Sequence, residues 1–186
     1  DGFDTFDMAD HYGSAELISG RAQEILQRQQ QNVDSLNPAR FHTKWCPKPG
    51  VMLPKVVRDA IDERADRLRV ESIDLLQFHW WTFQHPGYLD AMEGLVLAQQ
   101  SGRINKIGLT NFDTNHLRVL VRHGFPIVSN QVVVSMLDQR GLEEMTNVVL
   151  ENNIKLLAYG VLAGGFLTDK WLDKPEPANS DLSDWS

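Results

Sequence analysis

The sequence predicts an α/β fold of the (β/α)8 TIM-barrel type, with about six strand–helix units present. Short apolar runs alternate with segments of helical periodicity, which is typical of a parallel sheet joined by helical crossovers. The runs at 73–78 and 154–158 are almost continuously apolar, as expected for strands buried on both faces. The first strand–helix junction lacks GxGxxG, which disfavours an open doubly wound dinucleotide-binding sheet.

Six short segments are predicted to be strands from their length, their β-branched or aromatic content and the breakers that flank them. They are residues 2–8, 39–45, 72–80, 105–111, 126–134 and 154–160. Barrels of this type usually have eight strands. We therefore expect the barrel to be incomplete, with further strands supplied before the first residue, after the last, or both.

Five amphipathic helices are predicted between these strands. The second has Pro54 in its first turn, and the third ends at Gly102, which can close a helix in the left-handed conformation. The other boundaries are a cap at Ser14, a cap at Asp113 or Thr114, and a fifth helix from Leu142 to about Asn153.

The strand–helix pattern indicates one partial barrel domain over residues 1–170. Residues 171–186 (WLDKPEPANSDLSDWS) have a different character, with two prolines, several small polar residues and no periodicity. We predict that this segment is a loop or a disordered tail.

Composition limits the partners. The net charge of −7 and the absence of clustered Lys and Arg argue against nucleic acid, and no apolar run is long enough to suggest a membrane partner. The single cysteine, Cys46, is interpreted as a packing residue and fits a reducing compartment, so we expect a cytoplasmic location, with an organelle as the alternative. The six histidines lack metal-ligand spacing, so no metal site is predicted.

Polar side chains stand at the carboxyl end of every predicted strand or in the loop after it, where (β/α) barrels carry their catalytic residues. Each alone could be a satisfied core side chain or a helix cap. Together on one rim they indicate a site. The set is Asp7, Tyr12, Lys44, His79, Thr110, Asn111, Gln131 and Tyr159.

Four of these residues suit protonation of a carbonyl oxygen. Tyr12 would be the acid or base, and we expect the Lys44 ammonium to lower its pKa from the ordinary value of about 10. Asp7 would fix the ammonium in place, and His79 would hold the substrate oxygen.

Hydride attack on the carbonyl carbon would require a nicotinamide cofactor. The side-chain amides of Asn111 and Gln131 could grip its carboxamide, and Tyr159 could stack on its ring. Trp80 and Trp81 are candidates for the substrate pocket, the alternative being that one of the pair packs beneath a loop.

Six motifs, in order, resemble those of the aldo-keto reductase family. FDMADHYG resembles D-T-A-x-x-Y-G, with Met8 in place of the threonine, and HTKW resembles the T-K motif. DLLQFHW, KIGLTNF and SNQVVVSML are similar to D-L-x-x-x-H-W, I-G-x-S-N-F and N-Q-V-x-Y-S-L-L. AYGVLAGGFLTDK is similar to the Y-x-P-L-x-x-G-x-L-T-G-K loop. The motifs span nearly all of residues 2–170.

The resemblance implies an NADP-dependent oxidoreductase that uses NADPH to reduce a small carbonyl compound, an aldehyde or a ketone. Tyr12 would be the general acid, tuned by Lys44 and Asp7, and His79 would orient the carbonyl. By the same resemblance the cofactor would be held by Thr110, Asn111, Gln131, Tyr159, Gly160, Val161, Leu162, Gly164 and Gly165.

The chain departs from the family pattern at Val133 and Val134, which replace a polar and an aromatic residue, and at Val161, which replaces a proline. The family's opening hairpin and first strand would precede Asp1, and its last strand–helix unit would follow Ser186. Two unpaired sheet edges would leave room for a protein partner.

Two other functions are compatible with these residues. One is a cofactor-binding regulatory or assembly subunit of the same family with little turnover. The other is a Schiff-base aldolase at Lys44, which is disfavoured because the neighbouring Asp7 favours the charged ammonium over the neutral amine that this chemistry needs.

Overall fold

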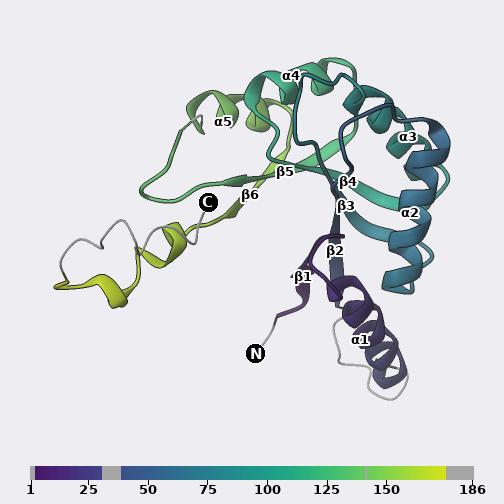
Figure 1. The fold of residues 1–186 in the computed structure, drawn as a ribbon, viewed down its shortest axis with the longest axis horizontal. Helices are drawn as coiled ribbons and strands as arrows, with labels where there is room; N and C mark the ends of the chain where they lie inside the picture. Colours follow the sequence, from purple (N-terminus) through teal and green to yellow (C-terminus); the bar gives the residue numbers. More distant parts are fainter. Residues whose placement is uncertain (1–2, 31–38, 141, 175–186) are drawn as a thin grey trace.

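The computed structural model describes residues 3–30, 39–140 and 142–174 (Figure 1). A six-stranded sheet runs through this part of the chain in the order β1-β2-β3-β4-β5-β6, and every neighbouring pair is parallel. The strands are β1 (Thr5–Asp7), β2 (Arg40–Trp45), β3 (Ile73–His79), β4 (Ile104–Thr110), β5 (Ile127–Val133) and β6 (Lys155–Tyr159).

Strand order separates the two architectures that a strand–helix alternation allows. A doubly wound sheet reverses its order at a switch point, whereas here each strand pairs with the next one along the chain. The sheet curls as it grows, and the helices follow its convex side (Figure 1). This curled half-barrel confirms the predicted fold class, a partial (β/α)8 barrel.

Five helices connect or follow the strands, and all five predicted helices are present. They are α1 (Ala15–Gln30), α2 (Pro54–Leu68), α3 (Tyr88–Gln100), α4 (Thr114–Arg122) and α5 (Leu142–Glu151). Asp113 is the cap of α4, because its Oδ1 accepts a hydrogen bond of 2.9 Å from the His116 amide. Helix α5 stops before Asn153, where a φ of 53° is incompatible with a right-handed helix.

The core lies between the outer face of the sheet and the helices. Its largest members include Trp80, Phe78 and Phe112. The ring centroid of Phe78 lies 5.7 Å from that of Trp80 and 6.0 Å from that of Phe112. Leu76, Leu95 and other aliphatic side chains fill the remaining space and are fully buried. This packing holds the central strands, and therefore their carboxyl ends, in fixed positions.

The first strand differs from the prediction. It covers only Thr5–Asp7, and all three residues are exposed, as is Phe3 at 82%. The reason is position: β1 is an edge strand that pairs only with β2 among the described residues. Residue 2, the first of the predicted strand, lies outside the described residues.

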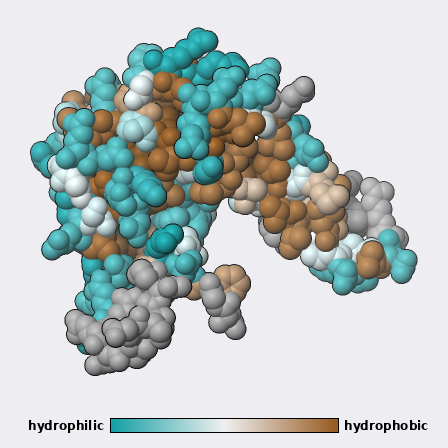
Figure 2. Space-filling view, turned by 180° about the vertical axis from the view of Figure 1, so that it is seen from behind, coloured by the Kyte–Doolittle hydropathy of each residue, from teal (hydrophilic) through white to brown (hydrophobic). Residues whose placement is uncertain are grey.

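The opposite edge is β6, and an apolar surface surrounds it. Figure 2 shows hydrophobic side chains along the arch and out onto the arm formed by the segment after β6. Exposed apolar residues on this arm and the neighbouring loop include Met136, Leu137, Val161, Leu162 and Leu172. Large exposed apolar surfaces are found at protein–protein contacts, membrane contacts and ligand-binding grooves.

The end of the described chain contains short turns of 3-10 helix at Ala163–Gly165 and Asp169–Trp171. The rings of Phe166 and Trp171 stack at 5.3 Å. The predicted tail at 171–186 lies mostly outside the described residues, so its boundary stays a prediction. None of the helices in the described ranges combines the length and hydropathy needed to cross a bilayer.

Candidate active site

The carboxyl ends of the strands surround a hollow of about 320 Å³. The structure brings together nine of the residues predicted for the site, and adds His11. The lining consists of Asp7, His11, Tyr12, Lys44, His79, Trp81, Thr110, Asn111, Gln131 and Tyr159. All six strands contribute to it, either at their last residues or through the loop that follows.

An ion pair forms the floor of the hollow. Lys44 Nζ lies 2.5 Å from Asp7 Oδ2 and also donates to the Met8 carbonyl oxygen at 2.9 Å. Asp7 accepts two further bonds, from Gln77 Nε2 at 2.6 Å and from Gln131 Nε2 at 3.2 Å. The lysine side chain is only 3% exposed, so the pair is held in one geometry by buried neighbours.

Gln77 was not predicted as a site residue, although the sequence carries a signal for it. It is a fully buried polar residue inside the otherwise apolar strand β3. Buried amides are found where they have a partner. Its partner is Asp7, two strands away in the sheet.

Tyr12 lies in the loop after β1, with its ring centroid 5.3 Å from Lys44 Nζ. Burial, followed by the negative charge of Asp7, raises the pKa of Tyr12. The expected net lowering of the Tyr12 pKa is therefore wrong, because burial and the charge of Asp7, which is paired with Lys44, outweigh the attraction of the ammonium for the phenolate. Tyr12 is a phenol at neutral pH and can donate a proton.

His79 is nearly buried at the end of β3, and burial, followed by the charges of His11 and Lys44, lowers its pKa. The imidazole is therefore neutral near pH 7 and can hydrogen-bond to a neutral oxygen. Its ring lies 4.2 Å from that of Trp81, and its Nδ1 lies 3.6 Å from Cys46 Sγ. Burial also raises the pKa of Cys46, to about 12, so the thiol is protonated.

The other wall of the hollow carries amide and hydroxyl groups from β4, β5 and β6. Tyr159 Oη donates to Asn111 Oδ1 at 3.0 Å, and the backbone N–H of Asn111 donates to the backbone carbonyl oxygen of Gln131 at 2.8 Å. Asn111 has a φ of 56°, which asparagine tolerates better than most residues. Thr110 is 4% exposed, and its Oγ1 has no hydrogen-bond partner among the described residues.

The orphaned Thr110 hydroxyl is a test of whether a nicotinamide fits. A buried hydroxyl without a partner is costly unless a ligand satisfies it. The carboxamide of a nicotinamide offers both a donor and an acceptor, and Asn111 and Gln131 lie beside Thr110 in the same hollow. The residues present therefore fit the group.

A second hollow, of about 340 Å³, lies beside the loop after β6. Of the residues predicted there, Gly160 and Gly164 line it, with Ser135 and Asp138 among the other lining residues. Positive φ angles at Gly160, Gly164 and Gly165 of 66°, 65° and 94° turn the backbone tightly around it. Val161 and Leu162 are instead exposed, and neither they nor Gly165 line this hollow.

Trp80 does not lie in the pocket. It is 2% exposed, packs against Phe78, and donates from Nε1 to the His85 carbonyl oxygen at 3.0 Å. The loop after β3 turns Trp81, 58% exposed, into the hollow and Trp80 into the core. The prediction that Trp80 lines the substrate pocket is therefore corrected.

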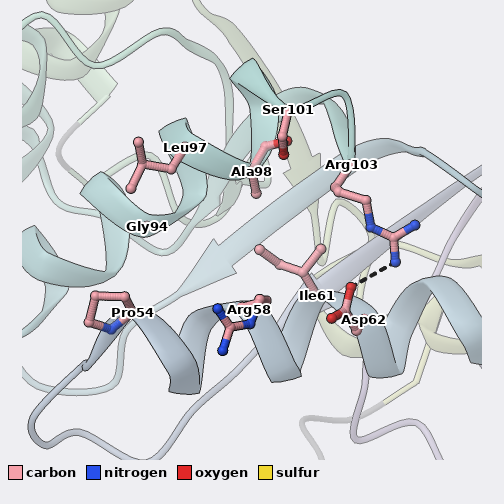
Figure 3. Close-up of a pocket in the computed structure, with 9 residues that line it drawn as sticks. All are labelled: Pro54, Arg58, Ile61, Asp62, Gly94, Leu97, Ala98, Ser101 and Arg103. Atoms are coloured by element: carbon pink, nitrogen blue, oxygen red, sulfur yellow. Dashed lines mark hydrogen bonds and ion pairs between the residues drawn. The ribbon is translucent and has the colours of Figure 1, made fainter.

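A further hollow, of about 360 Å³, lies between α2 and α3 and shares no lining residue with the strand-end hollow (Figure 3). Ile61, Leu97 and Ala98 form its apolar part. Its polar groups include an ion pair of 2.8 Å between Arg103 and Asp62. The pair is solvent-exposed, and no His, Cys, Tyr or Lys is among the described residues that line this groove, so the strand ends remain the candidate site.

Comparisons with known proteins agree with this geometry. The sequence model of the aldo/keto reductase family matches residues 1–185. Protein tas of Escherichia coli is 28% identical over 164 residues, which cover 77% of this chain and 47% of that protein. The chloroplastic pyridoxal reductase of Arabidopsis thaliana is 27% identical over 188 residues, covering 95% of this chain and 51% of that protein.

Among solved structures, the glycerol dehydrogenase of Gluconobacter oxydans superposes with a TM-score of 0.78 at 25% identity, over 98% of this chain and 57% of that one. The holo form of an aldo-keto reductase from Bacillus halodurans superposes with a TM-score of 0.72 at 23% identity, over 95% of this chain and 57% of that one, and supports the fold. The chain thus spans about half the length of the relatives it matches.

Proposed function

Because the chain belongs to the aldo/keto reductase family, we propose that its strand-end hollow is the carbonyl-reducing site of an NADPH-dependent oxidoreductase. The proposal rests on one observation, the arrangement of four side chains around the hollow. A protonated Tyr12, the ion pair of the buried Lys44 with Asp7, and the neutral imidazole of His79 line the same hollow. The proposed substrate is a small aldehyde or ketone.

In this proposal Tyr12 is the general acid and His79 orients the substrate. A carbonyl oxygen placed in the hollow accepts a hydrogen bond from the imidazole and faces the phenol. A nicotinamide held beside the hollow would supply a hydride for the carbonyl carbon. The electron pair of the C=O π bond moves to the oxygen, which takes the Tyr12 proton, and the Lys44 ammonium stabilises the tyrosinate left behind.

The cofactor would lie along the wall formed by β4, β5 and β6. Thr110, Asn111 and Gln131 would hold the carboxamide, and Tyr159 would contact the ring. The glycine-rich turn after β6 would approach the pyrophosphate, since its backbone is free of bulky side chains at Gly160 and Gly164. The preference for NADPH over NADH rests on the family resemblance.

The test is a turnover assay on the purified protein with NADPH and a panel of reactive aldehydes, following the absorbance of the reduced nicotinamide. We expect consumption of the cofactor that depends on the aldehyde and is lost in Tyr12→Phe. Tight cofactor binding without turnover across the panel would contradict the proposal.

A second candidate function is a cofactor-binding subunit that acts by assembly. It is favoured by the exposed apolar arm after β6 (Figure 2). It is also favoured by the outer sides of β1 and β6, which are unpaired among the described residues. A stable complex with another protein, together with slow or absent turnover, would support it. High turnover as a monomer would exclude a purely regulatory role.

A further inference from the structure

Three residues, of which His11 lines the hollow, bring together a thiol, an imidazole and a carboxylate. Asp10 and His11 lie in the loop after β1, and Cys46 directly follows β2. One ligand atom from each lies within 4.8 Å of the other two. The backbone N–H of Cys46 donates to Asp10 Oδ2 at 2.9 Å, and this hydrogen bond connects the two loops.

We propose that Asp10, His11 and Cys46 bind a thiophilic divalent cation of the zinc class. Zinc bonds of about 2.3 Å to sulfur and about 2.0–2.1 Å to nitrogen or oxygen place the ligand atoms of a tetrahedron roughly 3.3–3.6 Å apart. His11 Nδ1 and Asp10 Oδ1 are 3.0 Å apart, and the widest separation in the cluster is within 4.8 Å. Shifts of about 1 Å complete the site, with water as fourth ligand.

The surroundings leave the required lone pairs accessible. Asp10 Oδ2 accepts from the Cys46 backbone amide and from Arg64 Nη2 at 3.3 Å, whereas Oδ1 faces the His11 imidazole. The His11 side chain is 47% exposed, so it can rotate to present a nitrogen. Of the two nearby cations, Arg64 is paired with Asp10 and Lys44 with Asp7, which limits their repulsion of a bound metal.

Binding exchanges the thiol proton for the cation. Cys46 S–H becomes a metal-bound thiolate, one proton is released to solvent, and affinity consequently rises with pH. His79 Nδ1, 3.6 Å from Cys46 Sγ, is placed to donate a hydrogen bond to that thiolate. The donor set selects for zinc, cobalt or cadmium over magnesium and calcium, which prefer oxygen ligands.

A consequence for turnover rests on the proposed function. His11 and His79 line the same hollow, and Cys46 contacts His79. A cation at the cluster therefore holds one lining residue of the hollow, His11, and the neighbour of another, Cys46 beside His79. We expect micromolar zinc to inhibit carbonyl reduction and a chelator to restore it.

The binding test does not depend on activity. The purified protein is titrated with cobalt(II) and followed by its absorption spectrum, then with zinc to displace the cobalt, and with magnesium as a negative control. We expect one cobalt per chain, with the charge-transfer absorption of a thiolate ligand. Cys46→Ser should abolish that absorption, and His11→Gln should weaken binding by at least ~10-fold, since second-shell changes alone cost about 10- to 100-fold.

The matched control is His123→Gln, which removes an exposed histidine at the end of α4 and should leave binding unchanged. Circular dichroism checks that each variant is folded. If Cys46→Ser does not fold, the result for His11→Gln decides, because the His11 side chain is exposed and its replacement should not disturb the fold. Cobalt binding without thiolate absorption, or binding that survives in both ligand variants, would overturn the site. If the protein binds the metal but zinc does not inhibit carbonyl reduction, the metal site stands and the proposed inhibition of turnover is overturned.

Discussion

Replacing Tyr12 with phenylalanine tests the candidate site most directly, because it removes one oxygen atom and leaves the ring. Tyr12 is half exposed, and its hydroxyl appears in no hydrogen bond among the described residues, so the folded state should lose little. General acid catalysis contributes about 10²- to 10⁴-fold. At about 1.36 kcal/mol per tenfold, removal of the acid should raise the activation free energy by about 3–5 kcal/mol.

The assay is kcat from the absorbance of the reduced nicotinamide, combined with the dissociation constant of NADPH from its fluorescence. We expect kcat to fall by about 10²-fold or more. The dissociation constant should stay nearly constant, because the proposed cofactor contacts come from other residues, including Asn111 and Gln131. Tyr88→Phe is the matched control, since that ring packs outside the hollow against Phe83. Retention of most activity in Tyr12→Phe would refute the assignment.

Three further predictions use other parts of the molecule. Lys44→Met should lower kcat, and combining it with Tyr12→Phe should cost far less than the sum of the two effects, as a double-mutant cycle in kcat would measure. Alkylation of Cys46 at pH 8, followed by mass spectrometry, should be slower than that of a free cysteine by on the order of a thousandfold and should accelerate as pH rises, because the pKa of about 12 leaves little thiolate. Gly108→Ala should lower the free energy of unfolding in urea by about 1–3 kcal/mol, because the added Cβ would lie 2.4 Å from a serine hydroxyl of the next strand. Gly50→Ala is the control and should change stability little, because nothing lies within 4 Å of its Cβ. Rapid alkylation at pH 8, additive kinetic losses or equal stability of the two glycine variants would each contradict the corresponding inference.

The fold and most of the hollow could be predicted because parallel topology converts sequence order into spatial order. Once the runs around Asp7, Lys44 and His79 were interpreted as consecutive parallel strands, their carboxyl ends had to share a rim. The structure places these three side chains in one hollow. Nothing finer than strand assignment was needed for that result.

What could not be predicted depends on loop geometry and on the balance of charges. The sequence does not indicate which of Trp80 and Trp81 turns inward, because both follow β3 directly. The sign of the Tyr12 pKa shift required knowing that Lys44 is already paired and that Asp7 lies close enough to oppose ionisation. The cluster of Asp10, His11 and Cys46 has no spacing motif, because it forms only where two βα loops meet.

The hydrogen bond from Gln131 to Asp7 joins residues 124 positions apart and connects β5 to β1, which are not neighbours in the sheet. A flat arrangement of the same strands would hold these side chains far apart, because adjacent strands are about 4.8 Å apart. The bond can therefore form only after the sheet has curled through most of its arc. Contacts this distant along the chain are among the last to form during folding. The carboxylate that fixes Lys44 thus reaches its full set of partners only in a chain that has completed its curvature, and a partly folded chain with every helix in place would still lack a finished site.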